Sequence, residues 1–425
     1  MTVQEFIHIP KTGGTSLIPL MDQGFHQDEI FPAQLWREID EEVLNKISSF
    51  KFFRGHFRAD GAESIIGKRT KKYCLLREPV SLLQSRYHHE SREPETRNYR
   101  VITKERLSFT EYLQNDDVTW NTSPQFNYLA SCVSTNGISA LKEVKSFEDQ
   151  IRWQAKFITK PKSLPEVIGE LDHFGLVGVT EFFEQSALLI RNQLGLPPQK
   201  NYQSLRTTKL QANSERASKY NMPELAERMQ VDYALYDYAL QNLNRKWMHL
   251  CKELQIPTAI ETDRQYELAT KKLHRIWLEK LAAKQAESSA YFEFDQIIPG
   301  SNWQRREFAP ADKKYFCWTG PNTKSEIAFA VQRGTTKKLR MRIIDAVHPD
   351  VFDRLTITVN GQPAAHQYDV KKGRVRILES SLPPSGTNIC RIEIDTGITA
   401  RKTDFDPSID DDRSIGAAVQ WINID

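Results

Sequence analysis

The 425-residue sequence has few cysteines and no long apolar run. Its five cysteines form no C-x-x-C pair, which argues against a zinc motif or a disulfide framework and fits reduced thiols. No stretch approaches the length of about 20 apolar residues that spans a bilayer, and the first predicted strand begins too early to leave room for a signal peptide. We therefore expect a cytoplasmic protein with no membrane span and no metal.

Neither positive nor negative charge predominates in the sequence. The 58 Lys and Arg residues nearly balance the 55 Asp and Glu residues, giving a net charge of +3, so no nucleic-acid partner is expected. The hydrophobic content of 39% is typical of a globular protein, and the length exceeds one usual domain.

The chain begins with an apolar segment, Phe6–Ile9, followed at once by a loop rich in glycine and hydroxyl groups. Such a loop, between a buried strand and a helix, turns backbone N–H groups and the positive helix end towards an anion. Its candidate phosphate ligands are Lys11, Thr12, Gly13, Gly14, Thr15 and Ser16. Lys11 precedes the glycines, whereas the NTPase loop places its Lys after them, which argues against ATP hydrolysis.

Pro-Lys-Thr-Gly-Gly-Thr-Ser at residues 10–16 resembles the 5′-phosphosulfate loop of carbohydrate sulfotransferases that use 3′-phosphoadenosine 5′-phosphosulfate (PAPS). This family contains the heparan 2-O- and 6-O-sulfotransferases and their bacterial relatives, and the resemblance covers residues 6–250. It implies a P-loop-like α/β fold, with PAPS as the donor and 3′-phosphoadenosine 5′-phosphate (PAP) as the product. The animal members are Golgi-anchored and no anchor is predicted here, so a bacterial cytoplasmic enzyme is expected.

The segment Phe50–Phe57 predicts a second strand that ends in a loop, and His56 lies just past the end of that strand. Ligands gather at the carboxyl ends of parallel strands, so His56 is expected near the phosphate loop. There a neutral imidazole can take a proton from an acceptor hydroxyl. Gly55-His56 is similar to the family dipeptide that carries the proposed base; the alternative is a structural histidine.

A third strand, Tyr73–Leu76, ends at Arg77, and a helix is expected from Pro79. Arg-Glu-Pro, with Ser85 eight positions after the Arg, matches the family pattern that grips the 3′-phosphate of PAPS, so Arg77 and Ser85 are candidate cofactor ligands. An ordinary surface arginine and a helix serine are the alternative.

The remaining candidates depend on weaker signals. Gln125 and Leu129 are kept from a family stretch that tends to touch substrate, which makes Gln125 a candidate substrate ligand, with ordinary packing equally open. The loop at 202–209 corresponds to one that closes over the nucleotide in relatives, and its candidate donors are Ser204, Arg206 and Thr208, with a plain surface loop as the alternative. Val177–Glu181 is typical of a central strand of the family and is assigned no catalysis.

The rest of the pattern predicts further helices and then strands. Asp28–Phe50 favours helix, Phe183–Leu194 predicts a helix ended by Gly195, and Met222–Leu254 and Thr262–Ser288 have helical spacing. After residue 290, eight short β-rich runs alternate with turns, and Asn360-Gly361 is a hairpin signal. The predicted runs are Tyr291–Phe294, Tyr315–Trp318, Ile327–Val331, Leu339–Ile344, Leu355–Val359, Val375–Leu378, Cys390–Ile394 and Ala418–Ile422.

We therefore predict an α/β sulfotransferase domain at 1–255, a helical linker at 256–289 and a jelly-roll type β-sandwich at 290–425. Trp303 and Trp318 either stack on sugar rings or fill the sandwich core. Asp410–Asp412 is a calcium candidate, although a solvated turn is favoured.

The predicted activity is transfer of a sulfuryl group from PAPS to a hydroxyl, with His56 as base and with Lys11 and the loop N–H groups stabilising the departing phosphate. The acceptor is a carbohydrate by resemblance, with a lipid or small metabolite left open. A nucleotide kinase and a non-catalytic glycan-binding protein that uses the β-sandwich are two competing hypotheses. The oligomeric state is not indicated.

Overall fold

The structure is a computed structural model that describes residues 2–96, 98–115, 118, 123–160, 162–199, 227, 229–371, 373–409 and 411–425. The described chain divides into two compact units. The first lies within residues 2–14, 29–187 and 227–247, and the second within 15–28, 188–199 and 248–425. Neither unit is a continuous segment, and the expected division into three consecutive segments stays a prediction.

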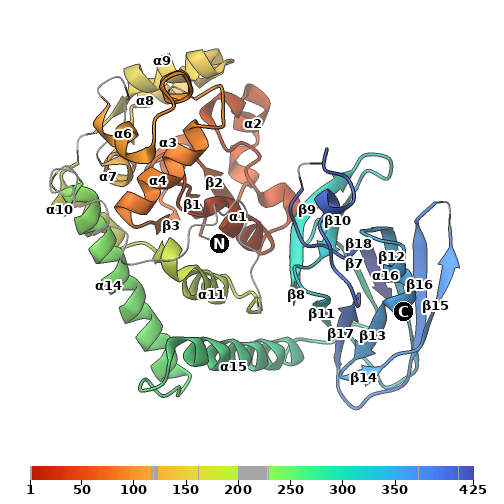
Figure 1. The fold of residues 1–425 in the computed structure, drawn as a ribbon. Coiled ribbons are helices and arrows are strands. Elements are labelled where there is room, and N and C mark those ends of the chain that lie inside the picture. The colour runs from red at the N-terminus through yellow and green to blue at the C-terminus, as the bar shows by residue number, and fades with distance from the viewer. Residues whose placement is uncertain are drawn as a thin grey trace. The chain divides into compact units, whose positions relative to one another are not determined.

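The first unit is built on a parallel sheet (Figure 1). Its strands are β1 (Gln4–Ile7), β2 (Phe52–Gly55), β3 (Lys71–Leu76) and β6 (Leu176–Val179), in the order β2-β1-β3-β6. All four pair in parallel, and most of their residues are buried, as expected for strands covered on both faces. The expected α/β organisation with a parallel sheet is confirmed.

Helices surround this sheet. Those within the first unit are α2 (Glu41–Asn45), α3 (Gly61–Ile66), α4 (Pro79–Glu90), α5 (Tyr99–Glu105), α6 (Phe109–Gln114), α7 (Pro124–Leu129), α8 (Thr135–Ser139), α9 (Phe147–Phe157) and α10 (Leu164–Leu171). A small pair of strands, β4 (Cys132–Val133) and β5 (Ile158–Thr159), lies apart from the main sheet. Short 3₁₀ turns occur at Gln27–Glu29, Trp36–Glu38, Ile47–Ser49, Leu141–Glu143, Thr180–Phe182 and Lys402–Asp404.

The prediction of helix across Asp28–Phe50 is wrong for most of that segment, because only α2 is α-helical. Ile30 and Phe31 are buried, and Ile30 forms a parallel bridge to Phe52, which extends the chain beside β2. Pro32 follows and disfavours the α conformation for the residue before it.

Three helices continue from one unit into the other: α1 (Gly14–Asp22), α11 (Phe183–Gln193) and α14 (Gln230–Glu253). The predicted helix at Phe183–Leu194 is confirmed, and Gly195 after it has a φ of 73°. The second unit adds α15 (Thr262–Ala282) and α16 (Asp350–Arg354).

The rest of the second unit is an antiparallel β region. One sheet has the order β15-β16-β12-β18-β10-β9, with β7 also paired to β18, and the other has the order β14-β13-β17-β11-β8. The strands are β7 (Ala290–Glu293), β8 (Gly300–Ser301), β9 (Trp303–Ala309), β10 (Lys314–Thr319), β11 (Lys324–Ala330), β12 (Lys337–Ala346), β13 (Thr356–Val359), β14 (Gln362–Pro363), β15 (His366–Val370), β16 (Arg376–Leu382), β17 (Ile389–Asp395) and β18 (Ala417–Ile424).

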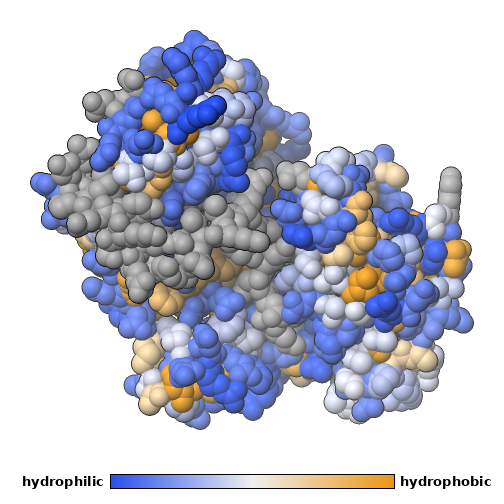
Figure 2. Space-filling model, in the orientation of Figure 1, coloured by the Kyte–Doolittle hydropathy of each residue, from blue (hydrophilic) through white to orange (hydrophobic). Residues whose placement is uncertain are grey.

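One hydrophobic core holds the two antiparallel sheets together. It takes buried residues from both, among them Met341 and Val419 from the first sheet and Ile327 and Ile392 from the second. Each of the eight predicted runs overlaps an observed strand, so the all-β character of this region is confirmed. Its visible surface mixes hydrophilic and hydrophobic residues (Figure 2).

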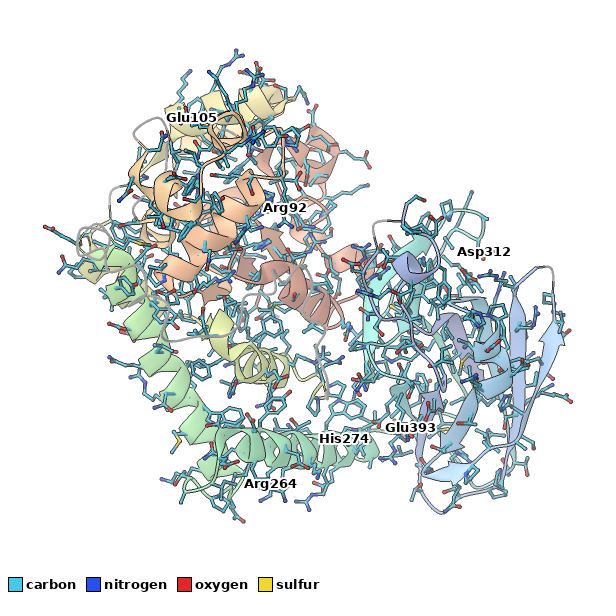
Figure 3. The ribbon with its side chains drawn as sticks, viewed as in Figure 1. Arg92, Glu105, Arg264, His274, Asp312 and Glu393 are labelled. Carbon is cyan, nitrogen blue, oxygen red and sulfur yellow. The ribbon has the colours of Figure 1, made fainter. Side chains whose placement is uncertain are left out.

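Helix α15 packs against the β region. His274 of this helix, labelled in Figure 3, lies 2.5 Å from Glu326 of β11 through its Nε2, and both side chains are largely buried. The carboxylate accepts a hydrogen bond from the imidazole, and this contact attaches the helix to the second sheet.

Candidate functional site

The carboxyl ends of the four parallel strands lie at one edge of the sheet. Ile7 at the end of β1 pairs with Gly55 at the end of β2, and Leu76 at the end of β3 pairs with Val179 at the end of β6. The segments that follow these strands therefore meet at one edge. They carry the phosphate-type loop, His56, Arg77 and Thr180.

The loop after β1 has the backbone of an anion cradle. Lys11 and Gly13 have φ values of 69° and 92°, on either side of Thr12. Left-handed residues in such a succession turn neighbouring N–H groups towards a common point. Thr12 is buried, and its hydroxyl donates to the carbonyl of Ile9 at 2.8 Å. Helix α1 begins directly after, so its N-terminus adds to the positive field.

Thr180, after β6, holds the same loop from a second side. Its hydroxyl lies 2.6 Å from the carbonyl oxygen of Thr12 and 3.1 Å from that of Leu76. The end of β6 thus bridges the loop and the end of β3. The sequence pattern predicts this residue only as part of an architectural strand.

Residue 14 has to be a glycine because the His8 ring lies very close to it. A Cβ added there would lie 2.2 Å from Cδ2 of His8, far inside van der Waals contact. The second glycine of the loop therefore allows the His8 ring to lie against the first residue of α1.

His56 is held in one tautomer. Its Nδ1 lies 2.7 Å from the carbonyl oxygen of His8, and a carbonyl only accepts hydrogen bonds, so Nδ1 carries the proton. The Nε2 lone pair is then the basic position. Burial lowers the pKa of His56, and the hydrogen bond to His8 opposes this only in part. The imidazole is accordingly neutral near pH 7, as a general base must be.

His8 is a second histidine at this site, and sequence reasoning missed its role. Its ring stacks on that of His56 with 4.3 Å between centroids and an angle of 25°. Burial lowers the pKa of His8 to about 3, with further lowering from the charges of His56 and Lys11. The available signal was a polar residue placed directly after an apolar strand and before the loop.

Arg77 is tied to the loop. Its Nη1 donates to the carbonyl oxygen of Lys11 at 3.0 Å, which joins the end of β3 to the turn after β1. Burial lowers the pKa of Arg77 while the nearby carboxylates of Glu181 and Glu78 oppose that effect. An arginine remains charged under such conditions.

Gln125 fixes the backbone of Arg77. Its Oε1 accepts from the Arg77 N–H at 2.8 Å, and its Nε2 donates to the Arg77 carbonyl at 2.9 Å. The side chain is completely buried. The structure thus gives Gln125 a positioning contact, and its contact with an acceptor stays a prediction.

Asp232 on α14 supports Gln125 in turn. Its carboxylate accepts from the backbone N–H groups of Gln125 at 3.1 Å and Phe126 at 2.8 Å, at the start of α7. Burial raises the pKa of Asp232 to about 6. No sequence signal distinguished this acid from the surrounding helix residues.

Ser85 lies in α4, where it is buried. The helix starts as expected at Pro79, and Glu78 caps it by accepting from the N–H groups of Val80 at 3.1 Å and Ser81 at 2.6 Å. The role of Ser85 in holding a 3′-phosphate stays a prediction.

The remaining candidate residues divide in two groups. Thr15 and Ser16 lie in the first turn of α1, with Thr15 exposed. Ser204, Arg206 and Thr208 lie outside the described residues, as does Asp410 of the acidic triplet.

Metal clusters and membrane-spanning helices are both missing from the part of the chain that the structure describes. Within it, no group of three or more His, Cys, Asp or Glu side chains is arranged to hold a metal ion. Among the helices described, none combines the length and apolar character needed to cross a membrane.

Comparisons with known proteins do not assign this chain to a family. No family model and no curated protein matches the chain. Among solved structures, the chain is similar to a family GH115 4-O-methyl-α-glucuronidase with specificity for decorated arabinogalactans. The similarity has 9% identity and a TM-score of 0.20, over 93% of this chain and 49% of that one. The chain thus spans about half the length of that protein.

Proposed function

We propose that the chain is a PAPS-dependent O-sulfotransferase. One observation carries the proposal: a cationic loop, a neutral histidine of fixed tautomer and a loop-bound arginine meet at one edge of a parallel sheet. These are the groups that the family resemblance assigns to donor binding and proton removal.

The residues present suit an anionic nucleotide donor. The positive φ values of Lys11 and Gly13 shape a cradle of backbone N–H groups, and the Lys11 side chain adds a cation. Arg77 donates from Nη1 to the loop carbonyl, and its Nε has no hydrogen-bond partner among the described residues, so we propose that the rest of its planar fork binds a phosphate. We assign the 5′-phosphosulfate to the loop and the 3′-phosphate to Arg77 and Ser85.

PAPS supplies a sulfuryl group already bonded to a good leaving phosphate. His56 Nε2 takes the proton of the acceptor hydroxyl while that oxygen forms a bond to sulfur. The bond between sulfur and the bridging phosphate oxygen breaks, and the electron pair goes to the 5′-phosphate of PAP. Lys11 and the loop N–H groups stabilise the charge that develops there. The acceptor leaves as a sulfate ester.

The finer architecture forms part of the same proposal. We assign the parallel sheet to a P-loop-like fold and the antiparallel β region to a jelly-roll type sandwich. We further propose a cytoplasmic enzyme whose acceptor is a carbohydrate hydroxyl, with a lipid or small-metabolite hydroxyl as the second class to screen.

A labelled-sulfate assay tests the activity. The purified full chain is incubated with [³⁵S]PAPS and separate pools of polysaccharides, glycolipids and small hydroxylated metabolites, and acid-labile label in the acceptor is counted. We expect incorporation in one pool, and loss of that incorporation in His56→Asn. The absence of transfer to every pool, or equal transfer by the variant, would contradict the proposal.

A further inference from the structure

Trp318 in the β region does not belong to the core between the two sheets. Its neighbour Cys317 packs in that core, whereas Trp318 forms a separate cluster with Ile415 and Ala418. Successive residues of a strand point to opposite faces, so Trp318 lies on the other face of its sheet. Trp303, in contrast, packs in the shared core and donates its indole N–H to the Glu326 carbonyl at 2.9 Å.

A cavity of about 400 Å³ is bordered by Trp318 and by several loops. Its apolar wall includes Trp318, Val347 and Phe405. The Phe405 ring is 55% exposed and stacks on His348 with 5.6 Å between centroids. An aromatic face at a cavity mouth offers a platform for a second flat, partly apolar group.

Equal numbers of cationic and anionic side chains border the same cavity. Arg374 pairs with Asp345 at 3.2 Å, and the Lys402 ammonium lies 4.7 Å from the Trp318 ring centroid. The Asp406 carboxylate accepts from the N–H and hydroxyl of Ser408. Two cations and two carboxylates cancel formally, so the cavity is not electrostatically selective for a polyanion. A purely apolar ligand would remove these charges from water without replacing their hydrogen bonds.

We infer that this cavity binds one or two rings of a neutral saccharide. A pyranose has an apolar face for Phe405 and a rim of hydroxyls that both donate and accept, which matches Asp345, Arg374 and Lys402. The volume is at the small end of the range of about 300–1,000 Å³ for small-molecule sites, in keeping with such a ligand. This site is separate from the proposed donor site and does not depend on the sulfotransferase proposal.

Affinity gel electrophoresis tests the inference without PAPS. The full chain is run in native gels that contain xyloglucan, galactomannan, β-1,3-glucan, arabinogalactan or, as an acidic comparison, alginate. We expect retardation in at least one neutral gel, and at least a tenfold weaker interaction for Phe405→Ala. The matched control is Phe308→Ala, another exposed phenylalanine of the β region, which should bind as wild type.

Three outcomes would overturn the inference. These are the absence of retardation in every neutral gel, retardation in alginate alone, and equal retardation of Phe405→Ala and wild type. Thermal unfolding of both variants shows whether each is folded, and because Phe405 and Phe308 are both exposed, neither change removes core packing.

Discussion

The two stacked histidines are the most informative residues of the candidate site. The His8 carbonyl sets the tautomer of His56, and the His8 ring lies between His56 and the first residue of α1. Two buried imidazoles in contact cannot both carry a charge at low cost. The pair therefore has one basic nitrogen, Nε2 of His56, and His56 follows β2 at the same sheet edge as the loop.

The first prediction concerns the pH dependence of turnover. Burial lowers the pKa of His56, so its neutral, active form persists below the ordinary value of about 6.5. We expect kcat to be level near neutral pH and to fall only below about pH 6.5, as protons bind. In His56→Asn we expect kcat to drop by about 10²–10⁴-fold with PAP affinity within about threefold of wild type. An acidic limb centred above pH 7 would contradict the assignment of His56 as the base.

The second prediction concerns stability in acid. The folded-state pKa of His8 is about 3, against about 6.5 when unfolded, so between these values the unfolded chain binds the extra proton. The free energy of unfolding of wild type should therefore fall, relative to His8→Asn, by about 1.4 kcal/mol for each pH unit below 6.5.

Urea unfolding of both proteins from pH 4.5 to 7.5 measures this difference. Glu5 and Asp232 have raised pKa values, to about 7 and about 6, and they act in the opposite direction, with stability lost as pH rises. Both groups are present in both proteins, so the difference isolates His8. Parallel curves would show that His8 does not remain neutral in the folded protein.

The third prediction concerns Gln125. Replacing it by Leu leaves the N–H and carbonyl of Arg77 without their amide partner, and an unsatisfied buried group costs about 1–3 kcal/mol. We expect urea unfolding to show a loss of that size and calorimetry to show weaker PAP binding. Wild-type PAP affinity in this variant would mean that Gln125 does not position Arg77.

At the scale of elements, the turn after α1 is held by the β region within the second unit. Arg306 of β9 donates to the carbonyl of Asp22 at 2.7 Å and to that of Phe25 at 2.9 Å. Gln23 donates to the Trp303 carbonyl at 2.9 Å. The helix that begins at the phosphate-type loop thus ends in a buried hydrogen-bond network with strands about 280 residues later.

The fourth prediction uses two neighbouring arginines. Arg306→Met removes the donors to three carbonyls, those of Asp22, Phe25 and Gln296, and should lower the free energy of unfolding by about 1–3 kcal/mol. Arg305→Met changes an exposed residue of the same strand and should stay within about 0.5 kcal/mol. Urea unfolding followed by circular dichroism checks both, and equal effects would contradict the assigned role of Arg306.

The elements were predictable where a local pattern decides them. The third strand ends at Leu76 and helix α4 begins at Pro79, as the apolar run and the proline predict. The first strand was predicted at Phe6–Ile9, whereas β1 spans Gln4–Ile7. The Asn360-Gly361 hairpin is confirmed, with both residues at positive φ and Val359 paired with Gln362.

Contacts between segments far apart in the sequence were not predictable. Asp232 lies 107 residues from Gln125, and Arg306 lies 284 residues from Asp22. Neither contact can therefore be recognised from a short stretch of the sequence. The helix predicted around Ile30 is also absent. The backbone is extended there because the bridge between Ile30 and Phe52 overrides the local helix propensity. The site's strand-end residues were found because parallel topology alone brings strand ends together.

At the scale of the whole molecule, the described chain divides into two compact units, and neither of them is a continuous segment. Residues 15–28 are grouped with the β region, although they follow the phosphate-type loop directly. The fifth prediction follows: a chain that ends at residue 288 lacks Trp303 and Arg306 and should lose PAP binding. Calorimetry of that fragment checks this, and wild-type affinity would show that the β region does not support α1.

The most direct test of the donor site is calorimetric titration of the full chain with PAP, AMP and ATP, repeated on Arg77→Ala. The matched control is Arg92→Ala, an exposed arginine just after α4. Our account predicts that PAP binds much more tightly than AMP or ATP, and that only Arg77→Ala removes this preference. Equal binding of PAP and AMP by wild type, or an unchanged preference in Arg77→Ala, would contradict the assignment of this edge as a PAPS site.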